Sequence, residues 1–205
     1  MTGAQVKAGG REGVTFVHRP ANYFAPLDLV ELFPVERPLE VELGSGDGSF
    51  LAQWAQRHPE RNFLGVERLL GRLRKLDRKA LRGGSSNLRL LRIEAGYFME
   101  YLLPPQSVSA IHVYFPDPWP KRKHRRHRLI NEQFTRLAAR VLKPSGHVFL
   151  RTDDADYFSQ MIAVFDGNAE FRRVEPSADL LAVVTDFERD FHAAGVKTLA
   201  AAYQR

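Results

Sequence analysis

The chain contains no cysteine. This absence excludes disulfide bonds, thiolate zinc sites and cysteine nucleophiles, and nothing in the composition points to an oxidising compartment or a metal site. The chain also lacks any apolar run near the roughly 20 residues that a membrane helix needs. The first residues, MTGAQVKAGGREG, lack the apolar core of a signal peptide. We therefore expect a cytoplasmic protein in which residues 1–14 form a polar, basic and flexible arm.

Acidic residues are missing from one strongly basic segment, Lys121 to Arg128, which holds six Lys or Arg. The whole chain has 30 Lys and Arg against 24 Asp and Glu, so removing these six leaves equal numbers of the two. A charge excess confined to one segment favours a docked polyanion such as RNA over a generally basic protein. The alternative is a solvated charge run or a helix start, which is a common role for such tracts.

The hydrophobic content, 44% of 205 residues, is enough to form the core of one large domain. Short runs rich in Val, Ile, Leu and Phe alternate with segments of helical period, which predicts an α/β fold with a parallel sheet between two helical layers. The expected strands are Leu39–Leu43, Asn62–Glu67, Leu88–Ile93, Val108–Phe115 and His147–Arg151, followed by Phe171–Glu175 and Val196–Tyr203. The expected helices are Gly48–Arg57, Leu69–Leu81, Tyr97–Leu102, Leu129–Leu142 and Tyr157–Phe165.

A glycine-rich turn, Gly44-Ser45-Gly46-Asp47-Gly48, follows the first expected strand and precedes a helix. Doubly wound folds bind ligands at this carboxyl end of the strand. Gly44 and Gly46 would let the backbone turn tightly and approach a ligand closely. The dinucleotide fingerprint G-x-G-x-x-G would need a glycine where Ser49 stands, which weakens a nicotinamide assignment. The simpler alternative is a tight strand-to-helix connection without a ligand.

Acids stand at the ends of three successive expected strands, at Glu42, Glu67 and Glu94. A carboxylate at Glu42 would repel a pyrophosphate but would attract the ammonium and sulfonium of S-adenosylmethionine. Glu67 is placed to accept hydrogen bonds from both ribose hydroxyls, and Glu94 falls where an adenine edge would lie. Solvated surface acids are the alternative, but three acids in this pattern favour a cationic nucleoside cofactor.

Three prolines stiffen the loop Pro116–Pro120, which follows the fourth expected strand. Trp119 offers an aromatic face for a base, and Lys121 lies within reach of phosphates. If the target is N(7) of guanine, its free lone pair attacks a methyl group without losing a proton, so Asp117 would position groups rather than act as a base. The alternative is a loop of type Asn/Asp-Pro-Pro-aromatic, which grips a planar nitrogen in DNA and glutamine amide methyltransferases.

The segment PDPWPKRKHRRHRL, Pro116 to Leu129, closely resembles the bacterial tRNA (guanine-N(7)-)-methyltransferase family. The resemblance extends from about Phe24 to near the C terminus. It implies a class I S-adenosylmethionine-dependent methyltransferase with a Rossmann-like fold and a seven-stranded, mostly parallel sheet. It also implies methyl transfer to N(7) of a guanosine in the tRNA variable loop, by a monomer or homodimer without an obligate protein partner.

The resemblance assigns roles to individual residues. It makes Glu42, Glu67, Glu94 and Asp117 cofactor contacts, in addition to Gly44 and Gly46, and it makes Asp117 the catalytic residue. It assigns substrate binding to Lys121, Asp153, Thr185, Asp186, Phe187 and Glu188. The residues alone predict a helix cap at Thr185 with Glu188 as its capping-box partner, and Asp154 and Asp156 leave the assignment of Asp153 open.

The chain departs from the family pattern at Glu94, usually a shorter Asp or Asn, and at Asp186, usually basic. We expect a shifted adenine contact at Glu94 and weaker phosphate attraction at Asp186. Two alternatives stay open beside this function. One is a methyltransferase of another RNA base or substrate, and the other is a non-catalytic RNA-binding protein on the same fold.

Overall fold

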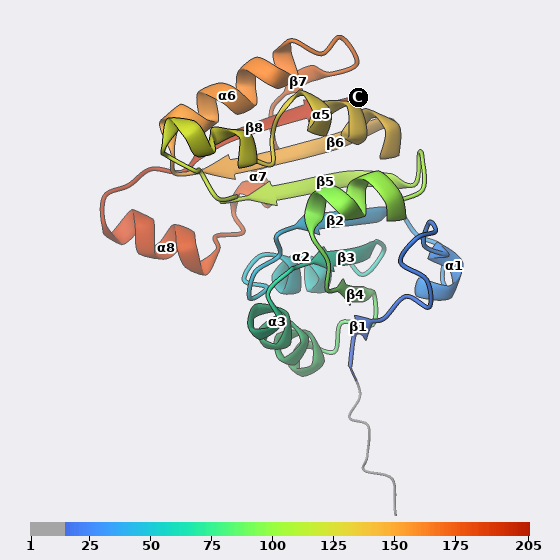
Figure 1. Cartoon of the computed structure of the whole chain (residues 1–205). Coiled ribbons are helices and arrows are strands. Elements are labelled where there is room, and N and C mark those ends of the chain that lie inside the picture. Colours follow the sequence, from blue (N-terminus) through green and yellow to red (C-terminus); the bar gives the residue numbers. More distant parts are fainter. Residues whose placement is uncertain (1–14) are drawn as a thin grey trace, which may run out of the picture.

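The computed structural model describes residues 15–205, so the arm expected over residues 1–14 lies outside the described residues. Its strands form one sheet in the order β1-β4-β3-β2-β5-β6-β8-β7 (Figure 1). The strands are β1 Val17–His18, β2 Leu39–Leu43, β3 Asn62–Val66, β4 Leu88–Leu91, β5 Val108–Tyr114, β6 Leu142–Thr152, β7 Arg172–Val174 and β8 Leu199–Gln204. Only β8 runs antiparallel to its neighbours β6 and β7, which confirms the expected mostly parallel sheet.

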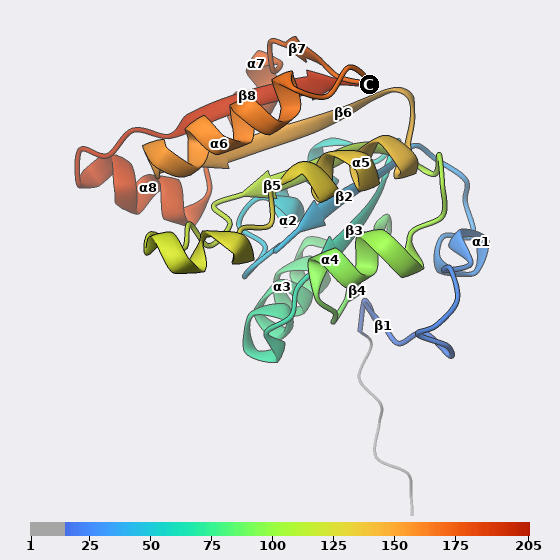
Figure 2. The same cartoon turned by 45° about the horizontal axis from the view of Figure 1, so that its top comes forward.

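Helices cover both faces of this sheet (Figure 2). They are α1 Leu29–Leu32, α2 Leu51–Arg57, α3 Leu70–Gly83, α4 Ala95–Tyr97, the π-helical turn η1 Phe98–Leu102, the 3₁₀ helix η2 Arg122–His127, α5 Glu132–Val141, α6 Ala155–Asp166, α7 Ala178–Leu181 and α8 Asp186–Ala193. Apolar side chains of η1, α5 and α6 form the core on one face. Those of α2, α3 and α7 form the core on the other, so the fold has three layers.

All seven expected strands are present, and an eighth, β1, pairs with β4 through Val17 and Leu90. A strand of two residues shows no periodicity that sequence analysis could detect. Helix α5 begins later than expected, because the side chain of Asn131 accepts a hydrogen bond from the Phe134 N–H (3.0 Å) and so caps the first turn. Residues 143–146 interrupt the pairing between β6 and β5, which is made at Leu142 and again from His147.

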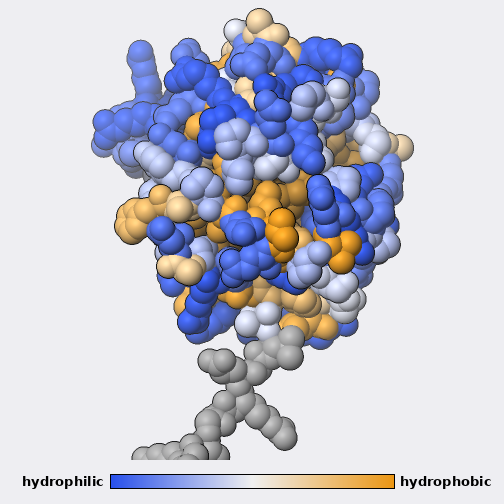
Figure 3. Space-filling view, turned by 90° about the vertical axis from the view of Figure 1, so that its right-hand side faces the viewer, coloured by the Kyte–Doolittle hydropathy of each residue, from blue (hydrophilic) through white to orange (hydrophobic). Residues whose placement is uncertain are grey.

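In the sheet, β3 and β4 lie on one side of β2, whereas β5 and β6 lie on the other. The direction in which successive strands are added therefore reverses between β2 and β5. Ligands of doubly wound folds bind at the carboxyl ends of the strands beside such a reversal. This edge lies at the left in Figure 1. Figure 3 shows the opposite side of the molecule, where apolar surface lies amid hydrophilic side chains. Within residues 15–205, no helix is long and apolar enough to span a membrane.

Candidate active site

The glycine-rich turn lies at the carboxyl end of β2, and its three glycines have positive φ angles of 76°, 55° and 80° at Gly44, Gly46 and Gly48. A Cβ atom added to Gly48 would come within 2.1 Å of a Leu76 methyl carbon, so this glycine lets α3 pack against the turn. An added Cβ at Gly44 would meet no atom within 4 Å among the described residues, and one at Gly46 would meet only a carbonyl oxygen at 3.9 Å. These two glycines therefore serve backbone geometry and leave open space beside the turn.

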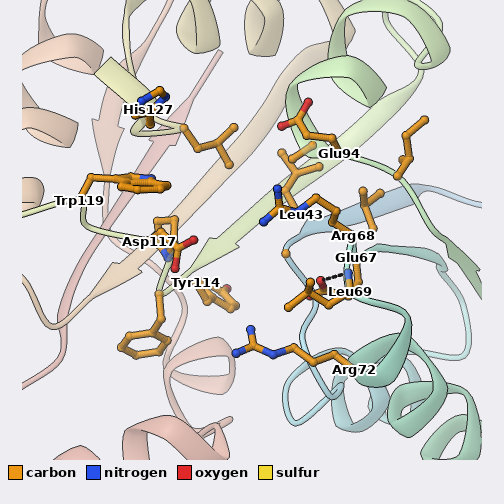
Figure 4. A pocket seen from close by; sticks show the side chains of 17 residues that line it. Leu43, Glu67, Arg68, Leu69, Arg72, Glu94, Tyr114, Asp117, Trp119 and His127 are labelled. Atoms are coloured by element: carbon orange, nitrogen blue, oxygen red, sulfur yellow. Dashed lines mark hydrogen bonds between the residues drawn. The ribbon is translucent and has the colours of Figure 1, made fainter. Parts of the chain in front are cut away.

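One pocket beside this turn brings together acids from three successive strand ends. Glu67 follows β3, Glu94 follows β4 and Asp117 follows β5, and all three line the pocket with Gly44 (Figure 4). Parallel strands place their carboxyl ends at one edge, which brings these three acids to one pocket. Their individual roles remain a proposal.

Glu67 holds the turn in place. Its Oε2 accepts a hydrogen bond from the Gly46 N–H (3.0 Å), and its Oε1 accepts one from the Leu69 N–H at the start of α3 (2.7 Å). A carboxylate has about four lone-pair sites, so each oxygen can still accept from a ligand hydroxyl. The carboxylate is thus fixed by backbone groups before a ligand binds.

Glu94 caps α4. Its two oxygens accept hydrogen bonds from the N–H groups of Gly96 (2.8 Å) and Tyr97 (2.7 Å). The longer side chain therefore bends back onto its own backbone, which gives a physical reason for the expected shift of an adenine contact at this position.

Glu42 lies in β2, in the middle of the sheet, and is only 4% exposed. Unlike Glu67, Glu94 and Asp117, it does not line the pocket, although the next two residues of the chain, Leu43 and Gly44, do. Burial raises the pKa of Glu42 to about 8. The positive charge of Arg151 opposes this rise, whereas the negative charges of Glu67 and Asp47 add to it. Within residues 15–205, its Oε2 has no hydrogen-bond partner. Ionising a buried carboxyl group without a partner costs free energy, so the group stays protonated below pH 8, and a cationic ligand would offset the cost of ionising it. The buried carboxyl group is therefore a candidate partner for the ammonium of S-adenosylmethionine, and the turn leaves room for a ligand beside Gly44 and Gly46.

The proline loop between β5 and η2 is held in a strained, anchored conformation. Phe115 and Trp119, which flank Pro116-Asp117-Pro118, have φ angles of 51° and 44°, a region that costs non-glycine residues about 1–3 kcal/mol. The Nε of Arg128 donates to the carbonyl oxygen of Pro118 (2.7 Å) and so ties the loop to the protein. In Figure 4 the Asp117 side chain points into the pocket, with Trp119 beside it.

Arg128 corrects part of the sequence interpretation, because it is 2% exposed and cannot contact RNA. Its guanidinium donates to Gln160 (2.9 Å) and Asp156 (2.6 Å) as well as to the loop, and it stacks 4.7 Å from the centre of the Tyr157 ring. The basic segment Lys121 to Arg128 therefore offers fewer cations to an RNA than its six Lys and Arg residues indicate.

The rest of the basic segment is exposed around η2. Arg125 pairs with Asp156 (3.0 Å), whereas four other cations make no ion pair within the described part of the chain: Lys121, Arg122, Lys123 and Arg126. The imidazole of His127 lies 5.1 Å from the Trp119 ring and lines the same pocket. This surface therefore continues from the pocket to solvent.

The structure narrows the choice among the three acids after β6. Asp154 accepts a hydrogen bond from the Tyr157 N–H and caps α6, and Asp156 pairs with arginines. Asp153 makes no hydrogen bond or ion pair among residues 15–205 and stands partly exposed at the carboxyl edge. It is therefore the acid that remains free to contact a substrate.

The segment Thr185–Glu188 forms the predicted capping box at the start of α8. Glu188 also pairs with Arg151 (3.0 Å), and both Thr185 and Glu188 are buried. Phe187 is 47% exposed, and its ring centre lies 6.5 Å from that of Phe115 in the proline loop. Thr185 and Glu188 thus hold α8 against the sheet, while Asp186 and Phe187 reach the surface.

Two further residues of the pocket, Arg68 and Arg72, escaped sequence analysis. They lie across the pocket from Trp119 and His127 (Figure 4). In the sequence, the one feature that could have marked Arg68 as a pocket residue is its position directly after Glu67. That feature does not distinguish Arg68 from other surface arginines.

Comparisons with known proteins agree with this geometry. A family model described as "Putative methyltransferase" matches residues 36–201. The tRNA (guanine-N(7)-)-methyltransferase of Syntrophotalea carbinolica is 36% identical over 139 residues, which cover 68% of this chain and 60% of the relative. That of Rubrobacter xylanophilus is 36% identical over 158 residues, covering 77% and 70%. That of Thermotoga maritima is 33% identical over 175 residues, covering 84% and 56%, so the chain spans less than two thirds of several curated relatives.

Solved structures show the same fold at low sequence identity. The 16S rRNA methyltransferase KamB superposes with a TM-score of 0.61 at 18% identity, covering 86% of this chain and 91% of that one. TrmN from Thermus thermophilus superposes with a TM-score of 0.59 at 19% identity, covering 86% and 47%. These likenesses establish the class I methyltransferase fold. The family model and the curated relatives above show that the chain belongs to the tRNA (guanine-N(7)-)-methyltransferase family.

Proposed function

We propose that this protein transfers a methyl group from S-adenosylmethionine to N(7) of a guanosine in the tRNA variable loop. The products would be 7-methylguanosine and S-adenosylhomocysteine. The observation that carries the proposal is the convergence of Glu67, Glu94 and Asp117 on one pocket beside the anchored Trp119 loop. Family membership supports the same reaction.

The residues around the turn fit the cofactor, which supplies an electrophilic methyl group on a sulfonium. Glu42 would pair with its ammonium, because the unpartnered Oε2 is buried beside the turn. The backbone at Gly44 and Gly46 would pass close to the ligand. Among residues 15–205, an added Cβ would meet nothing within 4 Å at Gly44 and only a carbonyl oxygen, at 3.9 Å, at Gly46. Glu67 would accept from the ribose hydroxyls, and Glu94 would lie beside the adenine.

Asp117 and Trp119 would hold the guanine. N(7) needs no general base, because its lone pair is free and points outward from the base. Asp117 would accept hydrogen bonds from N–H donors on the opposite edge of the guanine, or lie near the sulfonium, and Trp119 would stack on a base. Catalysis would then come from alignment and partial desolvation, for which the anchored loop costs little ordering entropy.

The tRNA would dock through its backbone on the exposed cations around η2, with Lys121 nearest the loop. Asp153 and the exposed Phe187 and Asp186 would contact the presented nucleotide or its neighbours, and Thr185 and Glu188 would position α8. We further propose that the chain acts as one methyltransferase domain in the cytoplasm, as a monomer or homodimer without an obligate protein partner.

The test is to incubate the protein with unmodified tRNA and S-adenosylmethionine, then to map modified nucleosides by mass spectrometry. We expect 7-methylguanosine at one variable-loop position. Methylation of a different nucleoside would favour another RNA methyltransferase. A protein that binds tRNA but neither binds the cofactor nor methylates would be a non-catalytic RNA-binding protein, contrary to the proposal.

A further inference from the structure

Helix α3 carries a second concentration of positive charge, which the overall balance of charges concealed. Six of its 14 residues are Lys or Arg, and one, Asp77, is acidic. Arg68 stands just before the helix. The exposed cations of this segment, called here the α3 face, are Arg68, Arg72, Arg74, Lys75, Arg78 and Arg82.

The acids near α3 do not neutralise this face. The Oδ1 of Asp77 accepts a hydrogen bond from the Phe16 N–H (2.8 Å), and its Oδ2 accepts one from the Thr15 hydroxyl (2.9 Å). Lys79 pairs with Asp47 (3.0 Å) and Asp186 (3.3 Å). No cation of the α3 face makes an ion pair within residues 15–205.

The spacing of these charges does not serve helix stability. Arg74, Arg78 and Arg82 follow one another at intervals of four residues, which places like charges side by side on the helix. A solvated surface helix usually interleaves acids with bases, and such alternation is absent here. A bound polyanion would offset the repulsion, so the pattern favours a ligand with many phosphates.

The α3 face begins at the pocket. Arg68 and Arg72 line it on one side, opposite Trp119, which precedes η2, and His127, which is the last residue of η2 (Figure 4). The helix then extends about 20 Å from this point, so an RNA whose base entered the pocket would pass between two cationic surfaces.

We propose that the α3 face is a second contact surface for the phosphate backbone of tRNA, across the pocket from η2. The inference rests on the proposed function and deepens it, because it assigns the RNA a position on both sides of the target base. Binding would release counterions at both surfaces, so the affinity would depend on salt more steeply than one surface alone would make it.

The test compares two triple variants of the full chain. Arg74→Gln, Lys75→Gln and Arg78→Gln remove three charges from the α3 face without touching the pocket, and Gln preserves helix propensity. The matched control is a triple variant with Arg136→Gln, Lys143→Gln and Arg173→Gln. It removes the same charge from exposed positions that belong neither to the α3 face nor to η2. Fluorescence anisotropy would give the Kd for unmodified tRNA over a range of salt concentrations, without the cofactor.

We expect the α3 variant to bind tRNA at least about tenfold more weakly, and the slope of log K against log salt to fall by about 2. The control should change both quantities much less. Equal losses in the two variants would mean that only net charge matters, and wild-type binding by the α3 variant would mean that RNA does not contact the helix. Either result overturns the inference.

Two further measurements separate this inference from the proposed function. Calorimetric binding of S-adenosylhomocysteine should be the same in both variants and the wild type, which shows that the fold is intact. If the wild type binds tRNA through α3 but methylates no guanosine, the proposed function fails and the inference stands. If the variant loses affinity for vesicles of anionic phospholipid rather than for tRNA, the α3 face is a membrane surface and the inference fails.

Discussion

Replacing Glu42 by Gln should stabilise the free protein and weaken its cofactor site. In the folded protein burial raises the pKa of Glu42 from the ordinary value of 4.5 to about 8. Among residues 15–205, its Oε2 has no hydrogen-bond partner. Between these two pH values the folded state holds a proton that the unfolded state releases. The stability contributed at this position therefore falls as the pH rises from 4.5 to 8, and is constant above pH 8.

The magnitude follows from the size of the shift. Each pH unit in this window lowers the free energy of unfolding of the wild type by about 1.4 kcal/mol. The whole shift amounts to about 4 to 5 kcal/mol, which is an upper value because water can relax a charged site. Gln is isosteric and cannot ionise, so the stability of Glu42→Gln relative to the wild type should increase steadily across the window.

The assay is urea unfolding of both proteins at several pH values between 5 and 9, combined with calorimetry of S-adenosylhomocysteine binding. At pH 7 the wild type should release about 0.9 proton per ligand bound, because pairing with the ammonium ionises Glu42. The variant should lack this release and bind more weakly. Protons exchanged by the ligand itself are common to both proteins and cancel in the comparison.

A difference in stability that does not change with pH would refute the reasoning, since it would mean that Glu42 is already ionised in the free protein. Equal proton release by the two proteins would refute the assignment of Glu42 to the ammonium. The two readouts are independent, so the electrostatic argument and the binding argument can fail separately.

Three further predictions concern the loop and the buried network. Asp117→Ala should reduce methyl transfer by at least about a hundredfold while cofactor binding stays measurable by calorimetry; unchanged turnover would exclude its positioning role. Arg128→Lys should lower kcat by about tenfold or more without a matching loss of cofactor affinity, because Lys cannot serve all three acceptors, including the Pro118 carbonyl. Burial would raise the pKa of Glu40, but hydrogen bonds, first among them the one with His112, lower it to about 2. The wild type should therefore be more stable than Glu40→Gln by on the order of 3 kcal/mol. In urea titrations this difference should be complete above pH 4.5 and disappear toward pH 2.

The sequence predicted the sheet well because parallel strands buried on both faces appear as short, continuous apolar runs. The resemblance made Glu42, Glu67, Glu94 and Asp117 cofactor contacts. The last three line one pocket, since the residues that follow parallel strands share one edge, whereas Glu42 does not line it. The sequence could not predict β1, whose two residues show no period, nor the burial of Arg128, whose charge type normally indicates exposure. Outside Lys121–Arg128 the basic and acidic residues are equal in number, so a count over that part of the chain gave no sign of the cations that cluster on the α3 face.

The acids of the candidate site fall into two groups, and this division carries chemical meaning. Glu67 and Glu94 already accept two backbone N–H groups each, so they are fixed before any ligand arrives. Glu42 and Asp117 accept no hydrogen bond among residues 15–205, although one is buried and the other points into the pocket. The unpaired acid costs stability in the free protein only at Glu42, which is buried; Asp117 is exposed, so water can hydrate its carboxylate. In the proposed function, both acids take their partners from the ligands: a cation for Glu42, and the donors of a base or a sulfonium for Asp117. Such contacts form only when the ligands are bound, which is how a site can bind one state of the reaction more tightly than another.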